Sequence, residues 1–387
     1  MYHSADISTR VNIALITNRY YPAIGGNESF LKQFAEFLAH CGHSVTVYCS
    51  FFKDTNSSET YDQGEERINN VRVIRLQAIR LFGKDALTIL YPLIFMKDFI
   101  KKYDLIHTFT YGYSTSWIPA LRKLFSAIKA PIIFSPQYNG TPNFPRWLTA
   151  LYDQTLGKIS ISQANRIVLE TEIFKSLFGK NVSIIPPAVE TLILPQGEAE
   201  ITSWKRLNGI PENKKILLSI GRVSKEKGVQ FLLDAILSDK NYGKEYVLVI
   251  AGDGPYLNEA KNLVTSRLND KTKVYFLGQL VGKEKVLAFA AADSFISLSK
   301  AESFGITIIE AMQARLPLIL TDIPIFRYLG GKSAIYVTNT EVNSIHTAIQ
   351  AAVLRKKVLY PNINKYSVDN IAQQYLSLYS EVAGESQ

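Results

Sequence analysis

Short apolar runs alternate with longer amphipathic stretches along most of this chain. In the first part the apolar runs are rich in aliphatic residues, which predicts strands buried in a parallel sheet. The stretch 27–40 has apolar residues three and four positions apart, which predicts a helix. Asn27 or Ser29 could cap that helix, and Gly42 would end it. The predicted strands of this part are 11–17, 44–49, 71–75, 105–107, 131–134 and 166–169.

The alternation starts again after Pro186 and Pro187. Two successive strand–helix arrays predict an α/β protein with two doubly wound domains, and 387 residues are too many for one typical core. We place the first domain at 1–187 and the second at 188–366. The predicted strands of the second part are 215–220, 246–250, 274–276, 294–298 and 318–320, with a helix at 229–237.

The basic charge of the chain is spread along its length. Of the net charge of +9, residues 1–190 hold 20 basic and 15 acidic side chains, and the rest hold the other 23 and 19, so the excess is +5 and +4. A nucleic-acid-binding domain usually concentrates such charge on one face. We therefore expect no nucleic-acid partner, and favour phosphorylated substrates or an anionic membrane surface.

The cysteines and the first residues bear on compartment and metal binding. Cys41 and Cys49 form no C-x-x-C motif and the five histidines are scattered, which disfavours a disulfide framework or a structural zinc site. Residues 1–10 lack the apolar core of a signal peptide, so we expect a cytoplasmic protein. The longest apolar run, 86–96, has 11 residues, whereas a membrane-spanning helix needs about 20.

Two glutamates, Glu302 and Glu310, lie eight positions apart just after a predicted strand. Glu302 follows the strand 294–298, and Glu310 starts a helical run. In open α/β sheets the loops after the strands bind ligands, and the free N–H groups at a helix start favour an anion. Carboxylates beside such a site suit a ligand with both hydroxyls and phosphate, such as a sugar nucleotide. The alternative is two exposed acids stabilised by the helix dipole.

Glycine-rich and basic loops follow two other predicted strands. Gly25 and Gly26 precede the first helix, where a backbone can approach a phosphate closely; ordinary turn glycines are the alternative. In the loop 221–228, Arg222 offers a fork of donors and Lys227 a point charge, which together suit a diphosphate. A solvated charged loop is the alternative there.

Three further motifs are less specific. The stretch 251–255 resembles part of a dinucleotide fingerprint without its third glycine, so a tight turn with Pro255 in the first turn of a helix is favoured. His107 ends a predicted strand and could contact an acceptor or move a proton, or it could be structural. Gln137 and Tyr138 could bind sugar hydroxyls, with an ordinary turn as the alternative.

Together these motifs resemble those of the retaining glycosyltransferases of family 4, which have the GT-B fold. They run in the order typical of that family and span almost the whole chain. The resemblance implies two Rossmann-like domains facing a central cleft, and a C-terminal helix within 367–387 that packs back on the first domain. The matching motifs lie at 22–26, 185–190, 221–228, 251–255 and 302–312.

The resemblance also implies roles for the residues. Arg222 and Lys227 would neutralise the diphosphate as it leaves, so neither a metal ion nor another cofactor is expected. Glu302 would act beside them at the reacting centre, where it would bind the donor sugar and stabilise an oxocarbenium-like transition state. Glu310 would bind the ribose hydroxyls. The donor-binding residues implied are Gly25, Gly26, Arg222, Lys227, Phe304, Gly305, Ile306 and Glu310.

The implied reaction is transfer of a hexose from a UDP- or GDP-linked sugar to a glycan or a lipid-linked glycan, with retention. Gln137 stands where many members carry histidine; glutamine donates a hydrogen bond but cannot become an imidazolium. The alternatives are an inactive protein of the same fold that binds sugar nucleotides, and an NAD(P)-dependent two-domain oxidoreductase. The oxidoreductase would need a complete G-x-G-x-x-G after the first strand, which Gly25 and Gly26 do not supply.

The segment 80–102 is apolar with basic flanks. One interpretation is peripheral contact with an anionic membrane, at its cytoplasmic face, which would suit a lipid-linked acceptor. The other is a helix packed on the core with one solvated face. Pro92 would interrupt a continuous helix here.

Overall fold

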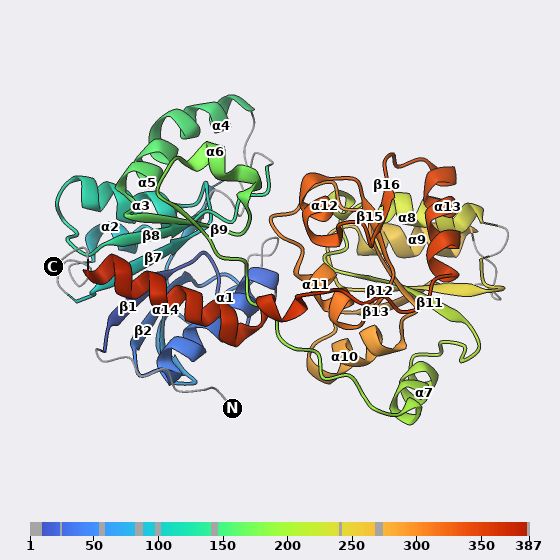
Figure 1. Ribbon diagram of the computed structural model, residues 1–387. Helices are drawn as coiled ribbons and strands as arrows, with labels where there is room; N and C mark the ends of the chain where they lie inside the picture. Colours follow the sequence, from blue (N-terminus) through green and yellow to red (C-terminus); the bar gives the residue numbers. More distant parts are fainter. Residues whose placement is uncertain are drawn as a thin grey trace. The chain divides into compact units, whose positions relative to one another are not determined.

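The chain folds into two compact units (Figure 1). Unit 1 comprises Met1–Ala188 and Tyr366–Gln387, and unit 2 comprises Val189–Lys365. The chain passes from unit 1 to unit 2 after Ala188, one residue beyond the boundary expected from the sequence. The computed structural model describes residues 10–23, 25–53, 59–81, 88–96, 102–140, 146–239, 242–267 and 274–384.

Unit 1 is built on an eight-stranded sheet in the order β10-β9-β8-β7-β1-β2-β4-β3. Its strand pairs are parallel apart from the edge pair β3–β4. The chain steps outward from β1 to β2 and then restarts at β7 on the other side of β1. Ligands are therefore expected at the carboxyl ends of β1 and β7. The strands are β1 (Asn12–Ile16), β2 (Ser44–Ser50), β3 (Gly64–Ile68), β4 (Val71–Leu76), β7 (Leu105–Phe109), β8 (Ile132–Ser135), β9 (Arg166–Leu169) and β10 (Val182–Ile184).

Successive residues of β1 face two different apolar layers, as the two-residue period of a strand requires. Ile13 and Leu15 pack with α1 (Gly26–His40) and α14 (Val368–Gly384). Ala14 and Ile16 pack with the helices on the other face. Unit 1 thus has helices on both sides of its sheet. The remaining helices are α2 (Pro92–Phe95), α3 (Ser114–Leu124), α4 (Arg146–Tyr152), α5 (Lys158–Gln163) and α6 (Lys175–Phe178), with a π-helical turn at Asp153–Gly157 and a 3₁₀ turn at Glu172–Phe174.

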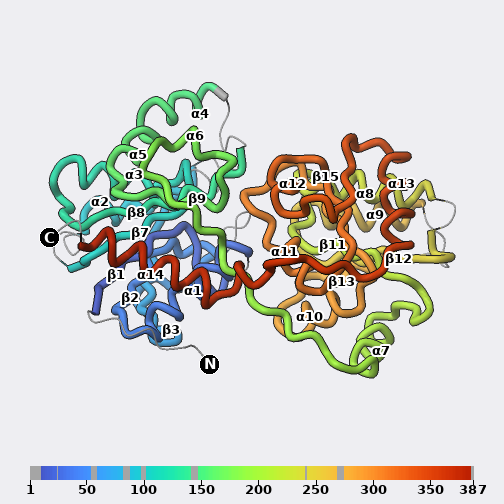
Figure 2. Tube along the Cα trace, viewed as in Figure 1, coloured from blue at the N-terminus to red at the C-terminus, as the bar shows by residue number. Residues whose placement is uncertain are grey.

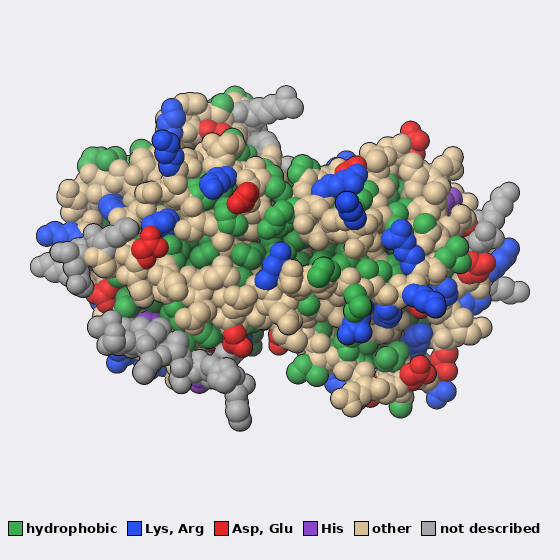
Figure 3. Space-filling model, viewed as in Figure 1, with side chains coloured by type: hydrophobic (Ala, Val, Ile, Leu, Met, Phe, Trp, Pro, Cys, Tyr) green, Lys and Arg blue, Asp and Glu red, His purple; other side chains and the backbone are tan. Residues whose placement is uncertain are grey.

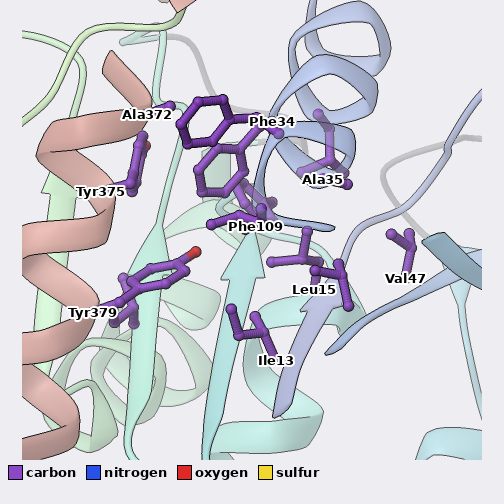
Figure 4. Packing of buried hydrophobic residues seen from close by; sticks show 14 of the residues in the cluster. Ile13, Leu15, Phe34, Ala35, Val47, Phe109, Ala372, Tyr375 and Tyr379 are labelled. Carbon is purple, nitrogen blue, oxygen red and sulfur yellow. The ribbon is translucent and has the colours of Figure 1, made fainter. Parts of the chain in front are cut away.

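The C-terminal helix α14 packs against α1 over the sheet of unit 1 (Figures 2 and 4). The ring centroids of Phe34 and Tyr375 lie 4.6 Å apart. Deeper in the core, His107 Nδ1 lies 2.6 Å from the Tyr379 hydroxyl and His107 Nε2 lies 2.7 Å from Ser135 Oγ. His107 is fully buried, and burial lowers the pKa of its imidazole to about 3. The ring therefore stays neutral and joins α14 to two neighbouring strands.

Unit 2 contains a parallel six-stranded sheet in the order β13-β12-β11-β14-β15-β16. Its strand order reverses between β11 and β14, so the loops after these two strands flank the expected ligand position. The strands are β11 (Lys215–Ile220), β12 (Tyr246–Ala251), β13 (Tyr275–Gly278), β14 (Ser294–Ser297), β15 (Leu318–Thr321) and β16 (Ile335–Val337). The helices are α7 (Glu198–Leu207), α8 (Val229–Ser238), α9 (Leu257–Arg267), α10 (Gly282–Ala291), α11 (Ile306–Gln313), α12 (Pro324–Gly330) and α13 (Val342–Val353). Short 3₁₀ turns lie at Lys225–Lys227 and Ile363–Tyr366.

The two sheets confirm the α/β class and the doubly wound arrangement, and some local predictions are wrong. The helix α1 is capped at Gly25 without a side-chain hydrogen bond, so neither Asn27 nor Ser29 caps it. The edge strand β3 was not expected because its residues are polar and exposed. It is held by cross-strand ion pairs, including Arg72 Nη2 to Glu65 Oε2 at 2.6 Å.

The segment 80–102 does not form one continuous helix. Its described part contains the end of the hairpin of β5 (Ile79–Arg80) and β6 (Thr88–Ile89), followed by α2. Pro92 is the first residue of α2, and Leu90 and Leu93 are buried whereas Phe95 is exposed. Lys84, Lys97 and Lys101 lie outside the described residues. None of the helices in the described ranges is long and apolar enough to cross a membrane.

Burial of neutral His107 predicts that unit 1 loses stability in acid. Folding lowers the pKa of His107 from 6.5 to about 3, so below pH 6.5 the unfolded chain binds a proton that the folded chain does not. The titration of this group therefore does not change the free energy of unfolding above pH 6.5, and this free energy falls by about 1.4 kcal/mol per pH unit as the pH drops toward 3. Replacement His107→Asn should lower the free energy of unfolding at pH 7 and flatten its decline between pH 6.5 and 4.5 in urea titrations. The exposed His40→Asn control should keep the wild-type slope. Equal slopes for all three proteins would contradict this assignment.

Candidate active site

A close backbone approach positions the basic loop after β11. Gly228 has φ 73°, and a Cβ on it would lie 2.0 Å from the Leu298 carbonyl oxygen, just after β14. Only glycine fits such a position without moving the backbone. The loops after β11 and β14, the two strands beside the reversal of strand order, are therefore held together.

This approach brings Lys227 and Glu302 into contact. Lys227 Nζ donates to Glu302 Oε1 at 2.5 Å, and the side chains are 32% and 17% exposed. This charge-assisted hydrogen bond joins two residues that lie 75 positions apart in the sequence. Because both groups keep some access to solvent, an incoming anion can reach the ammonium and an incoming hydroxyl can reach the carboxylate.

Arg222 lies on the same loop and is exposed. Its guanidinium pairs with no carboxylate in the part of the chain that the structure describes. The neighbouring backbone is held by the loop after β12, since Val223 N donates to Asp253 O at 2.9 Å. The loop after β11 thus offers the paired ammonium of Lys227 and the exposed guanidinium of Arg222 beside the reversal point.

The glycines of 251–255 allow the loop after β12 to pack closely against the loop after β11. A Cβ on Gly252 would lie 1.9 Å from the Gly221 carbonyl oxygen, and one on Gly254 would lie 2.5 Å from that of Val223. The stretch 251–255 is therefore a tight turn, as favoured from the sequence. Pro255 does not lie in the first turn of a helix, because α9 begins at Leu257.

The helix α11 begins at Ile306, so Glu310 is its fifth residue and does not start it. Gly305 is the N-cap, and no side chain caps the first turn. The backbone around Phe304, Gly305 and Ile306 therefore includes the helix start, where N–H groups remain for an anion.

Glu310 is nearly fully buried, and Lys285 of α10 holds it. Lys285 Nζ donates to Glu310 Oε1 at 2.6 Å. Burial raises the pKa of the Glu310 carboxyl, Lys285 lowers it, and Glu190 raises it. Sequence reasoning missed Lys285, because it and Glu310 lie on different helices, 25 positions apart.

In unit 1, the start of α1 contains a carboxylate of its own. Glu28 is buried and its Oε1 accepts from Arg19 Nε at 3.0 Å. A Cβ on Gly25 would lie 2.1 Å from Glu28 Oε2, so glycine makes room for this side chain. Gly25 and Gly26 therefore form the helix start as expected, with Glu28 as a neighbour that sequence reasoning missed.

The other unit 1 candidates differ in accessibility. His107 lies in the middle of β7 rather than at its end, and both ring nitrogens are engaged inside the core. No part of the ring is exposed, which agrees with the structural alternative for His107 and not with contact to an acceptor. Gln137 and Tyr138 follow β8 and are partly exposed; the Tyr138 ring packs edge-on against Tyr111 and Phe174.

Basic side chains occur over both units in the surface view (Figure 3), as the even charge distribution predicts. The structure places Arg222, Lys227, Glu302 and Glu310 on unit 2 and the other candidates on unit 1. Among the four, it brings Lys227 and Glu302 into direct contact.

Two protein-family models match this chain, one in each half of the sequence. Residues 24–191 match the model of Glycosyltransferase Family 4, and residues 200–366 match that of Glycosyl transferases group 1. Alpha-monoglucosyldiacylglycerol synthase of Streptococcus pneumoniae is 25% identical over 377 residues, which covers 92% of this chain and 81% of that protein. Mannosylfructose-phosphate synthase of Agrobacterium fabrum is 25% identical over 80% of this chain and 76% of its own.

Solved structures show the same fold. Sucrose-phosphate synthase from Thermosynechococcus elongatus superposes with a TM-score of 0.77 at 22% identity, over 97% of this chain and 100% of that chain. Anabaena Alr3699/HepE, solved in complex with UDP and glucose, gives a TM-score of 0.68 at 16% identity, over 97% and 98%. The chain therefore belongs to glycosyltransferase family 4 and has the GT-B fold.

Proposed function

We propose that this glycosyltransferase moves a hexose from a UDP- or GDP-linked sugar to a glycan or lipid-linked glycan acceptor, with retention at the anomeric carbon. The observation that carries the proposal is the contact of Lys227 with Glu302 beside the reversal of strand order in unit 2. It combines a cation for the diphosphate with an acceptor for a sugar hydroxyl. The solved complex of Anabaena Alr3699/HepE with UDP and glucose supports this ligand class.

In this proposal Lys227 exchanges partners when the donor binds. The ammonium is held by one carboxylate in this structure, and a diphosphate offers it more negative charge. Arg222 and the N–H groups at the start of α11 add positive potential at the same edge of the sheet. These groups neutralise the leaving diphosphate without a metal ion.

Glu302 and Glu310 bind the sugar and the ribose. Glu302 accepts a hydroxyl of the donor sugar and stabilises the positive charge that develops at its anomeric carbon. The bond from this carbon to the diphosphate oxygen breaks, the acceptor oxygen bonds on the same face, and the acceptor proton passes to the departing diphosphate. Glu310, which accepts a hydrogen bond from Lys285, accepts both ribose hydroxyls.

The names of two relatives favour a lipid-linked acceptor. The name of alpha-monoglucosyldiacylglycerol synthase contains a glycosylated lipid. The name of the Phosphatidylinositol N-acetylglucosaminyltransferase GPI3 subunit of Saccharomyces cerevisiae, 21% identical over 97% of this chain and 84% of its own, contains a phospholipid. The exposed side chains of Ile94 and Phe95 support peripheral contact of the segment 80–102 with the cytoplasmic face of a membrane. A screen of donors with and without lipid-linked acceptors tests this choice.

Replacement Glu302→Gln should lower kcat by about 100-fold or more, because it removes charge that stabilises the transition state. The product should retain the anomeric configuration of the donor when it is read by proton NMR. Binding of the nucleotide should persist in the variant. The matched control is Glu212→Gln, an exposed glutamate that pairs with Arg206 in the same unit. Wild-type turnover by Glu302→Gln, or an inverted product, would refute the assignment.

Replacement Lys285→Met should raise KM for the sugar nucleotide most strongly at low pH. Without Lys285 the pKa of Glu310 rises further, so a larger fraction of the carboxyl is protonated and cannot accept two hydroxyls. The defect should shrink as the pH rises and the carboxyl ionises. Stability should show the opposite trend, since a raised carboxyl pKa costs stability as the pH rises through it.

The matched control is Lys283→Met, which lies on the same helix as Lys285 and breaks an exposed ion pair with Glu200 of α7. It should leave KM and its pH dependence unchanged. If the rise in KM of Lys285→Met were the same at every pH, the explanation through the charge of Glu310 would be wrong.

A further inference from the structure

An arginine lies in the core-facing row of β4, the strand next to the edge of the unit 1 sheet. Val71, Val73 and Arg75 alternate along this strand, and all three are buried. The two valines belong to the apolar core shared with α1, so the same pattern would place a third apolar residue at position 75. Arginine is almost never fully buried unless its charge has a partner. The partners of Arg75 therefore indicate why it occupies this position.

The Arg75 guanidinium divides its donors between two elements. Its Nε donates to Glu66 Oε1 of β3 at 2.6 Å, and its Nη2 donates to the backbone carbonyl of Tyr21 at 2.7 Å. The central carbon of the guanidinium lies 4.5 Å from the centroid of the Tyr61 ring. Because Tyr21 belongs to the loop after β1, one buried cation joins this loop to the edge strand of the sheet.

Arg72, three positions earlier on β4, forms a cross-strand ion pair without such a second contact. Its Nε and Nη2 both donate to the carboxylate of Glu65, at 2.6 Å each. The Arg72 side chain is 26% exposed, whereas that of Arg75 is 4% exposed. Pairing β4 with the edge strand thus requires neither burial of the arginine nor a bond to the loop after β1, and Arg75 has both.

The loop that Arg75 holds leads to the start of α1. The Arg19 side chain in the same loop is bonded to a glutamate in the first turn of α1. The Tyr21 side chain is 42% exposed, so the loop is held at this residue through the carbonyl rather than by burial of the ring. Gly25 is the N-cap of α1 and Gly26 is its first residue. Two arginines therefore hold the loop just before these glycines.

We propose that Arg75 is a positioning residue for the nucleotide sugar. By fixing the Tyr21 carbonyl it sets where the loop enters α1, and so where the backbone N–H groups of Gly25 and Gly26 meet the diphosphate. This inference rests on the proposed glycosyl transfer, in which these glycines contact the donor. Arg75 is buried and acts through the loop rather than on the substrate.

Replacement Arg75→Met should raise KM for the sugar nucleotide by about 10-fold or more, because a displaced loop loses hydrogen bonds to a charged group. Affinity for the free nucleoside, measured by calorimetric titration, should stay unchanged. A variant that merely folds less completely would lose kcat and keep its KM. Hydrogen exchange read by mass spectrometry should also become faster in the peptides that contain Tyr21.

Arg72→Met serves as the control, because it breaks the neighbouring cross-strand pair on the same strand. It should leave both KM and the exchange of this loop unchanged. If Arg75→Met fails to fold, Arg75→Lys takes its place. Lysine keeps the buried positive charge but has one ammonium instead of a planar fork, so it cannot hold Glu66 and the Tyr21 carbonyl in the same geometry. This variant too should raise KM.

Two outcomes separate this inference from the proposed function. An unchanged KM or unchanged loop exchange in the folded Arg75 variant, or an equal rise of KM in Arg72→Met, would overturn the positioning role alone. A wild-type chain that transfers no sugar from any nucleotide sugar would overturn the proposed function, and the positioning role with it.

Discussion

The backbone approach of Gly228 to Leu298 is the constraint on which the candidate site depends. It holds the loop after β11 against the residues that follow β14, at the point where the strand order of unit 2 reverses. The contact of Lys227 with Glu302 follows from it. A similar approach of Gly252 to Gly221 holds the same loop from its other side. Three strand-end loops are thus packed by glycines into one edge that carries the charged groups.

The site in unit 2 is assembled from pairs of opposite charge, and this has a physical reason. A buried carboxylate such as Glu310 is costly without a partner, and Lys285 lowers that cost. The pair of Lys227 and Glu302 is more exposed, so it can open for a ligand at a smaller cost. In the proposed mechanism, the buried Glu310 is therefore a fixed acceptor, whereas Lys227 and Glu302 can change partners.

Much of the fold could be predicted from the sequence, because buried parallel strands are apolar runs with regular helices between them. The strands β9 and β11 have the predicted bounds. Polar edge strands such as β3 gave no such signal, since cross-strand ion pairs hold them rather than burial. His107 was placed at a strand end because β7 continues two residues beyond the predicted run.

The candidate site was predictable where residues share a motif and not where the fold brings distant residues together. Arg222, Lys227, Glu302 and Glu310 stand in recognisable loops and helices. Lys285 and Glu28 do not, because they are recognised only by contacts across elements: Lys285 with Glu310, and Glu28 with Arg19. The short 3₁₀ turn before Gly228 could not be read from the charged sequence around it.

The central claim is that the Lys227 ammonium leaves Glu302 for the diphosphate of a nucleotide. Calorimetric titration of UDP, GDP and the corresponding nucleosides into the wild-type chain and Lys227→Met tests it most directly. The account predicts that the variant binds the preferred nucleoside diphosphate at least about 10-fold more weakly, with nucleoside affinity unchanged. Equal affinity of both proteins for the diphosphates would contradict it.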